Sequence, residues 1–238
     1  MIFFSGVVEA HLTIDGEKSA LRAGGYLYET ARAVRRNVDS RVGILARLGN
    51  DGPGRIILES LVHDRIVFDP DLVCGDQPSF LVVEDMQGRT SCYSSFTCST
   101  SASSQELTRS LDENSDVDIV VMCAGALYHQ PLFSSILDAA TFHTPRPMLV
   151  IDVASSTYDH PDDVRLSRQI RQALSCADVL ILGQDDMHLF DNEDVKTLAP
   201  EVFMVQGGSL SRWKDGRHVS TQDGDRLDIY RQLCSQMG

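Results

Sequence analysis

The sequence has little positive charge and few aromatic residues. Its 21 Lys and Arg residues are outnumbered by 34 Asp and Glu residues, which gives a formal net charge of −13, and Phe, Trp and Tyr make up 7% of the 238 residues. Such an acidic chain is repelled by phosphate backbones and by anionic membrane surfaces. We therefore expect neither nucleic acid nor a membrane as a partner.

Several functional signatures are missing from the sequence. No apolar run approaches the length of a membrane span. The glycine pattern of a Rossmann dinucleotide site, the P-loop sequence and the histidine spacing of a metal site do not occur either. The six cysteines contain no C-x-x-C pair, and several lie in apolar runs, as Cys123 does. We therefore expect reduced, buried thiols in a cytoplasmic protein.

Apolar strands that alternate with amphipathic helices dominate the second half of the chain. The strand-like stretches are "DIVVMCAG", "PMLVID", "DVLILG" and "EVFMVQGG", and the helical segments between them include "QDDMHLFDN". This order predicts an α/β fold with a mostly parallel sheet in a single domain, residues 1–238. Ligands of such sheets bind beyond the carboxyl ends of the strands, so the turns that follow the strands, such as "IDVASST", are the places to look for a site.

The first half is less regular. "IFFSGVVEAHLTI" predicts one opening strand, "SRVGILARLG" another, and helices follow the Gly24-Gly25 pair and the turn "DGPG". Residues 79–96 predict a hairpin that turns at Met86-Gln87-Gly88.

Residues 2 to about 225 resemble the ribokinase-like (PfkB) family of carbohydrate and nucleoside kinases. The most specific motifs are Gly24-Gly25 at a helix start and "LGNDGPG", whose Gly49, Asp51 and Gly54 match the family's G-x-D-x-x-G. "VSTQDGD" (219–225) stands where the family has D-T-x-G-A-G-D. The resemblance implies a three-layer α/β/α sandwich with a small β lid at about 79–96. It also implies ATP-dependent phosphorylation of a sugar-like hydroxyl, with Mg²⁺ on the phosphates.

The resemblance also assigns roles to individual residues. Asp225 would be the general base and the Gly224 N–H would support the transferring phosphate, with the Gly207-Gly208 turn facing the nucleotide. The substrate-binding residues would be Gly24, Gly25, Glu29 and His11. Asp186 would hold magnesium through water.

Each of these residues has a plainer alternative. Asp225 would simply cap the following helix, and Gly207-Gly208 would form a hairpin turn. Gly24-Gly25 would be only a helix entry, and His11 a rim residue. Glu29 and Asp186 would be solvated.

The departures from the family pattern leave two functions open. His11 replaces an aspartate, Glu29 replaces an asparagine, and N-x-x-E becomes Gly183 and Asp186. The phosphate turn is one residue short and gains Asp223, and family members continue through further helices that wall the adenine pocket. We therefore expect weak nucleotide affinity. The protein is either a kinase with impaired chemistry or a non-catalytic binding or regulatory module on the same scaffold.

The lid hairpin predicts self-association. The hairpin should have a half-apolar face, because it carries too many large apolar side chains for each to be exposed singly, namely Phe80, Val82, Tyr93 and Phe96. We therefore expect a homodimer that forms through the lid.

Overall fold

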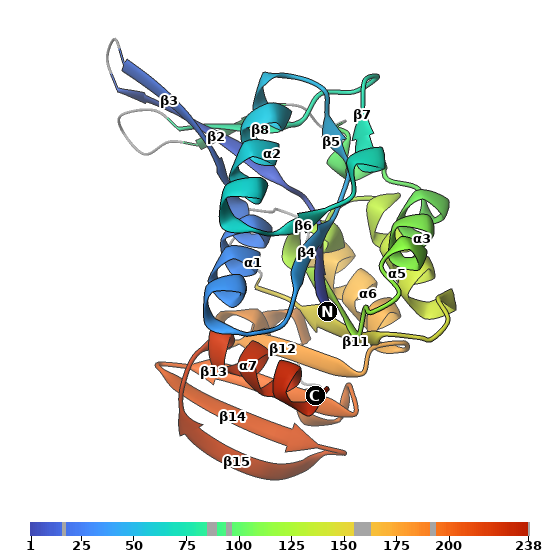
Figure 1. Ribbon diagram of the computed structural model, residues 1–238. Coiled ribbons are helices and arrows are strands. Elements are labelled where there is room, and N and C mark those ends of the chain that lie inside the picture. The colour runs from blue at the N-terminus through green and yellow to red at the C-terminus, as the bar shows by residue number, and fades with distance from the viewer. Residues whose placement is uncertain (16–17, 85–89, 94–96, 155–162, 191–193, 238) are drawn as a thin grey trace.

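The computed structural model describes residues 1–15, 18–84, 90–93, 97–154, 163–190 and 194–237 (Figure 1). Its main sheet has nine strands in the order β15-β14-β13-β12-β11-β10-β1-β4-β6, and neighbours pair in parallel except at β13-β14-β15. The strands are β1 (Ile2–Ser5), β4 (Val42–Leu45), β6 (Val67–Phe68), β10 (Ile119–Cys123), β11 (Met148–Asp152), β12 (Val179–Gly183), β13 (Glu201–Gln206), β14 (Ser209–Lys214) and β15 (Arg217–Asp223).

Helices cover both faces of this sheet. One face carries α1 (Gly25–Asn37), α2 (Gly52–Asp64) and α7 (Arg226–Gln236), and the other carries α3 (Ser104–Glu113), α4 (Ala124–Leu127), α5 (Leu132–Phe142) and α6 (Asp163–Leu174). Successive residues of a strand point to opposite faces, so Phe3 packs with α3 and α5, whereas Ile2 and Phe4 pack with α1 and α7. The predicted three-layer α/β/α architecture is confirmed.

The lid is a second sheet, larger than predicted. Its strand order is β3-β2-β8-β9, with β2 (Glu9–Asp15), β3 (Lys18–Gly24), β8 (Phe80–Glu84) and β9 (Thr90–Tyr93). In Figure 1 it lies at the end of the molecule opposite β14 and β15. The predicted hairpin is the β8-β9 pair, and its turn at Met86-Gln87-Gly88 lies outside the described residues. The prediction of one opening strand is wrong, because the chain leaves β1 in the main sheet and enters the lid as β2.

The lid residues named for self-association are placed differently from the expectation. Phe80 and Val82 are 7% and 5% exposed and belong to the core of the same chain, so they offer no apolar face to a second copy. The side chains of Tyr93 and Phe96 lie outside the described part. The homodimer therefore stays a prediction, which light scattering would test, and Phe80 and Val82 do not support it.

Two further segments differ from their predicted form. The predicted strand "SRVGILARLG" is divided into β4 and β5 (Leu48–Gly49), and β5 pairs with β7 (Val73–Cys74). The predicted helix "QDDMHLFDN" is a 3₁₀ helix, η4 (Gln184–Phe190). Among the described residues, short 3₁₀ turns also occur at η1 (Pro70–Leu72), η2 (Ser99–Ser101) and η5 (Val195–Thr197). None of the described helices is both long and apolar enough to cross a bilayer.

The cysteines correct another expectation. Cys74 and Cys98 form a disulfide, whereas free thiols were expected; Cys123 is free and buried, and Cys176 and Cys234 are free and partly exposed. The two bonded cysteines are 24 residues apart in sequence, and their Cα atoms lie 6.7 Å apart because the strand end at Cys74 meets the start of η2. No spacing pattern in the sequence indicates this pairing.

Candidate functional site

Buried polar side chains gather at the carboxyl edge of the main sheet. Strands β10, β11 and β12 end there at Cys123, Asp152 and Gly183, and α1 and α7 begin beside them with Tyr26 and Arg226. This is the edge at which parallel α/β sheets bind their ligands. These strand ends therefore meet at the edge where the sequence predicted a site.

Asp152 is the centre of this group. It is fully buried (0% exposed), and its Oδ2 atom accepts hydrogen bonds from the hydroxyls of Tyr26 and Tyr230, the latter at 2.5 Å. Its Oδ1 atom accepts from Nη1 of Arg226. Each oxygen of this carboxylate thus has a donor, as a buried charge requires.

Arg226 connects Asp152 to a second buried carboxylate. Its Nη2 atom lies 3.1 Å from Oδ2 of Asp186, which is 1% exposed and also accepts the Gly183 N–H at 2.6 Å. Two carboxylates and one guanidinium leave this group with one net negative charge. Removal of the only cation of this trio would leave two buried negative charges uncompensated.

The electrostatic effect on the surrounding groups follows from this arrangement. Burial acts to lower the pKa of Arg226, but the negative charge of Asp152 and its neighbours outweighs burial and holds that pKa above its ordinary value. Burial, followed by the charge of Asp152, raises the pKa of Tyr26, Tyr230 and the Cys123 thiol well above their ordinary values. The tyrosine hydroxyls therefore remain protonated donors at neutral pH.

Gly183 makes room for the guanidinium. A Cβ atom at this position would lie 3.1 Å from Nη2 of Arg226 and 3.3 Å from Oδ2 of Asp186. A larger residue, such as the asparagine of the N-x-x-E pattern, would have to displace Arg226. The position of the Arg226 guanidinium therefore depends on the absence of a side chain at Gly183.

Asp186 does not fit the predicted role of magnesium ligand. Its carboxylate is buried and accepts from both Arg226 and the Gly183 N–H. Mg²⁺ requires a nearly octahedral oxygen shell and usually keeps several waters. In this protein the guanidinium already supplies the positive charge between the carboxylates.

The start of α7 is closed by its own side chains. Asp225 is the N-cap, and its Oδ1 atom accepts from the N–H groups of Leu227 at 2.8 Å and Asp228 at 3.2 Å. The Asp228 carboxylate accepts the Asp225 N–H at 3.0 Å, which completes a capping box. The amides that would surround a phosphate therefore have partners within the chain.

The glycines near this turn are engaged as well. Gly207 and Gly208 have φ values of +54° and +80° and form the tight turn between β13 and β14. The Gly224 N–H donates to the Gly208 carbonyl oxygen at 2.9 Å. The structure thus brings these three predicted residues together, in contact with one another, and the plainer hairpin interpretation describes the Gly207-Gly208 pair.

Where the lid strand β2 meets the start of α1, Gly24, Gly25 and His11 also come together. A Cβ atom on Gly24 would lie 2.6 Å from the His11 ring, and one on Gly25 (φ +80°) would lie 2.7 Å from the Glu9 carboxylate. His11 Nε2 lies 3.0 Å from Glu9 Oε2. The glycine pair therefore allows α1 to begin directly against the polar side chains of β2.

Glu29 is exposed on α1, where its carboxylate pairs with Arg32 at 3.2 Å. It also lines a hollow of about 310 Å³ between α1 and α7, together with Tyr26, Arg226 and Leu227. The structure thus places Glu29 with Arg226.

The G-x-D-x-x-G motif holds the base of the lid. A Cβ atom on Gly54 would lie 1.9 Å from the Gly49 carbonyl oxygen, so the approach of these segments requires glycine. Asp51 caps α2 through the Gly54 N–H and accepts from the N–H and hydroxyl of Ser79, all at 2.8 Å. Burial acts to raise the pKa of Asp51, but the hydrogen bonds from Ser79 and Gly54 outweigh it and lower that pKa. The motif therefore fastens the residue before β8 to α2.

No family model matches the sequence, and no curated protein matches it either. Solved structures do match. The putative ribokinase II from E. coli, in complex with ATP and Mg²⁺, is 14% identical with a TM-score of 0.77, over 100% of this chain and 86% of that one. The PfkB protein from Polaromonas sp. JS666 is 14% identical with a TM-score of 0.78, over 100% and 90% of the two chains. This chain has a ribokinase-like fold.

A third similar structure is the aminoimidazole riboside kinase from Salmonella enterica, complexed with aminoimidazole riboside and an ATP analogue. It is 13% identical with a TM-score of 0.70, over 95% of this chain and 77% of that one. At such identities the comparison shows the ribokinase-like fold alone. The resemblance read from Gly24-Gly25 and the G-x-D-x-x-G turn is confirmed at that level.

Sequence analysis missed the buried group around Asp152. The turn "IDVASST" was among the strand ends selected for attention, so a charged residue at the end of a buried strand was the available signal for Asp152. Nothing in the sequence distinguished Arg226 from the other arginines, because its role depends on which carboxylates the fold places beside it.

Proposed function

We propose that this protein binds a sugar-like small molecule on a carbohydrate-kinase scaffold, and that phosphoryl transfer from ATP is suppressed in its resting structure. One observation carries the proposal: Arg226 bridges Asp152 and Asp186 at the carboxyl edge of the sheet. The Arg226 guanidinium thus lies between the two carboxylates. It belongs to the start of α7, where the amides of Leu227 and Asp228 are already hydrogen-bonded to Asp225 and the Gly224 amide to Gly208.

Two sets of polar groups support the ligand class. The Glu9–His11 pair lies against the Gly24-Gly25 turn, and Glu29 and Arg226 share the hollow between α1 and α7. Carboxylate, imidazole and guanidinium groups all form hydrogen bonds with hydroxyls. The fold is shared with proteins named as kinases of ribosides and sugars, which supports the same class of ligand.

The test is a panel of hexoses, pentoses, nucleosides and keto-deoxy sugar acids, read by thermal shift and by ADP release with Mg·ATP. We expect at least one compound to raise the melting temperature, while ADP release stays well below the roughly 1–100 s⁻¹ of kinases. Turnover within that range would overturn the proposed suppression. The absence of any thermal shift across the panel would overturn the ligand class.

A second candidate function is slow sugar phosphorylation with Asp225 as the base. It is favoured by the geometry of the carboxylate, because the helix amides hold Oδ1 and, within the described part of the chain, no hydrogen bond involves Oδ2. Oδ2 of this exposed residue would accept the proton of a substrate hydroxyl as the oxygen attacks phosphorus. The capping bonds to Oδ1 would fix its direction.

The variant Asp225→Asn separates the two candidates, because asparagine keeps the cap but cannot act as a base. If Asp225 is the base, the variant loses about 10²–10⁴-fold of sugar-dependent ADP release with its melting temperature unchanged. Asp223→Asn, an exposed carboxylate two residues earlier, is the matched control and should retain the rate. Turnover that survives Asp225→Asn would refute the base assignment.

A further inference from the structure

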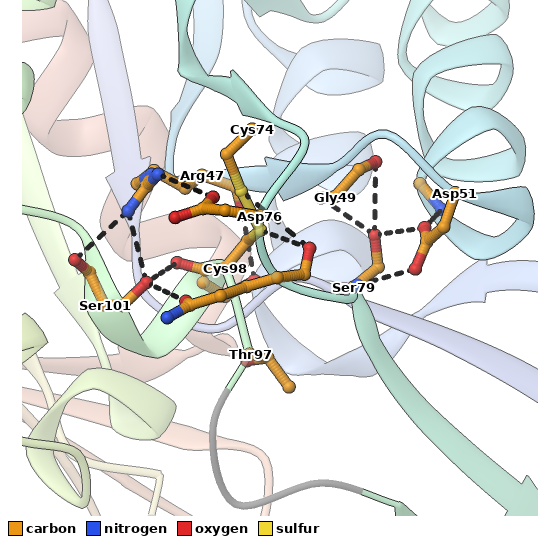
Figure 2. Close-up of a disulfide and its surroundings, with 12 residues drawn as sticks. Arg47, Gly49, Asp51, Cys74, Asp76, Ser79, Thr97, Cys98 and Ser101 are labelled. Atoms are coloured by element: carbon orange, nitrogen blue, oxygen red, sulfur yellow. Dashed lines mark hydrogen bonds and ion pairs between the residues drawn. A yellow bond between two sulfur atoms is a disulfide. The ribbon is translucent and has the colours of Figure 1, made fainter.

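The disulfide between Cys74 and Cys98 encloses the lid hairpin. Its two cysteines are 24 residues apart, and both β8 and β9 lie between them. Figure 2 shows the bond at the base of the lid, between Arg47 and Asp76 on one side and the Gly49–Asp51 turn on the other. We propose that this disulfide is a reversible thiol–disulfide exchange site for a low-molecular-weight thiol of the glutathione class, and that its oxidised form fastens the lid to the body of the protein.

Hydrogen bonds would hold the two ends of the loop together when the disulfide opens. The Cys98 N–H donates to the Pro78 carbonyl oxygen at 2.9 Å, and the Ser101 hydroxyl donates to Gln77 Oε1 at 2.5 Å. The Ser99 hydroxyl donates to the Arg47 carbonyl oxygen at 3.1 Å. Because these bonds do not depend on the sulfur atoms, the reduced protein keeps its fold and the thiols stay close enough to re-form the bond.

The two cysteine residues are not equally exposed. Cys74 is 8% exposed, whereas Cys98 is fully buried. The loop that follows Cys74 lines a surface hollow of about 270 Å³, formed by Asn50, Asp51 and residues 75–78. An incoming thiol therefore approaches from the side of Cys74, and Cys98 is the leaving group.

The exchange is balanced in two steps. A thiolate attacks Sγ of Cys74, the Cys74–Cys98 bond breaks, and a mixed disulfide forms at Cys74 while Cys98 leaves and takes up a proton. A second thiol then attacks the mixed disulfide and releases Cys74 as a thiol. Two external thiols have been oxidised to one disulfide and the protein disulfide has been reduced; oxidised glutathione reverses both steps.

Two neighbouring groups affect the exchange: the Gln77 carbonyl would hold the leaving Cys98 sulfur, and the Asp76 carboxylate affects the rate. The Gln77 carbonyl oxygen lies 2.7 Å from Sγ of Cys98, so it would accept the hydrogen bond of the new thiol. A carboxylate oxygen of Asp76 and the two sulfur atoms all lie within 4.8 Å of one another. This negative charge repels both the incoming and the leaving thiolate. Asp76 therefore slows exchange, and its ion pair with Arg47 at 3.6 Å only partly offsets that charge.

The consequence for the lid follows from the position of the bond. A covalent link between the ends of the loop limits the conformations that its strands reach when they open locally. Opening the link should therefore affect β8 and β9 more than the strands β10, β11 and β12, which lie outside the loop. The oxidation state of one cysteine pair thus sets the local stability of the lid.

The first experiment uses the native full-length chain in reduced and oxidised glutathione mixtures at neutral pH, followed by alkylation and peptide mass mapping. We expect Cys74 and Cys98 to change together and reversibly. Asp76→Asn should accelerate exchange by about 3- to 10-fold. Cys176→Ser, a change at a partly exposed cysteine outside the disulfide, is the matched control and should leave the rate unchanged.

The second experiment compares amide hydrogen exchange of the reduced and oxidised wild-type protein. We expect the amides of residues 81–84 and 90–93 to exchange at least about tenfold faster after reduction, with those of β10–β12 unchanged. A Cys74→Ser, Cys98→Ser double variant should reproduce the reduced profile. The wild-type comparison decides the matter if that variant does not fold.

Three outcomes would overturn the proposal. They are a disulfide that glutathione does not open in the native protein, a reduced protein whose lid exchanges as slowly as before, and an increase of equal size in every strand. The last would identify a bond that only stabilises the whole fold. None of these readouts requires a bound ligand, so they do not depend on the proposed function.

Discussion

At the scale of single residues, the pair of carboxylates bridged by Arg226 dominates the site. Asp152 and Asp186 are 0% and 1% exposed, so their charges cannot be compensated by water. The guanidinium fits this position because its two terminal nitrogens address one carboxylate each. Glycine suits position 183 because a side chain there would occupy the space of Nη2.

Arg226→Gln should therefore lower the free energy of unfolding by about 3–5 kcal/mol, the usual effect of removing one partner from buried charges. Arg231 in the same helix is the matched control: it forms an exposed pair with Asp228, and Arg231→Gln should cost about 0–1 kcal/mol. Urea denaturation at pH 7 measures both. Equal effects of the two substitutions would show that the Arg226 bridge contributes no more to the free energy of unfolding than an exposed ion pair.

At the scale of elements, the connection between α2 and the lid depends on Asp51. This carboxylate accepts two bonds from Ser79, immediately before β8, while it caps α2. Glycines at 49 and 54 allow these segments to touch. The turn that matches the family's G-x-D-x-x-G is thus the anchor of the lid.

Asp51→Asn should lower the free energy of unfolding by about 1–2 kcal/mol at pH 7, because the amide nitrogen cannot accept from Ser79. The folded-state pKa of Asp51 is depressed below its ordinary value of 3.8. Its contribution is therefore complete above that value and is lost as the pH falls through the lower, folded pKa. Urea titrations from pH 7 to pH 2.5 should show the wild-type and variant curves converging on the acid side. A constant difference across that range would contradict the role of the ionised carboxylate.

The elements also show how far sequence reasoning reaches. The strands from β10 to β13 were predicted because each is an apolar run bounded by polar turns, and such runs have one stable position in a sheet covered on both faces. The division of the opening segment between two sheets was not predicted, because "IFFSGVVEAHLTI" contains neither a proline nor a cluster of turn residues, so it was taken as one strand. The Cys74–Cys98 bond and the Arg226 bridge depend on contacts between distant segments, which local patterns do not encode.

At the scale of the whole molecule, the net negative charge and the few available hydrogen-bond donors both bear on phosphate binding. The net charge of −13 opposes an anionic ligand, so any phosphate would have to be held by local donors. At the edge of the sheet those donors are already in use: Arg226 serves two carboxylates, and the amides at the start of α7 serve Asp225. The fold is ribokinase-like, and the proposed suppression of phosphoryl transfer rests on these occupied donors.

Mg·ATP should therefore stabilise this protein very little. Stabilisation grows as RT ln(1 + [L]/Kd), so 5 mM Mg·ATP acting on a site with a Kd of about 5 mM or weaker adds at most about 0.4 kcal/mol, or roughly 1–2 °C in melting temperature. Differential scanning fluorimetry with Mg·ATP, Mg·ADP and Mg²⁺ alone measures the effect, and calorimetry gives the affinity directly. A Kd in the low micromolar range would mean that Arg226 leaves its two carboxylates, or that the amides of α7 open, when the nucleotide binds. Either movement would remove the reason for suppressed phosphoryl transfer and would favour Asp225 as a working base.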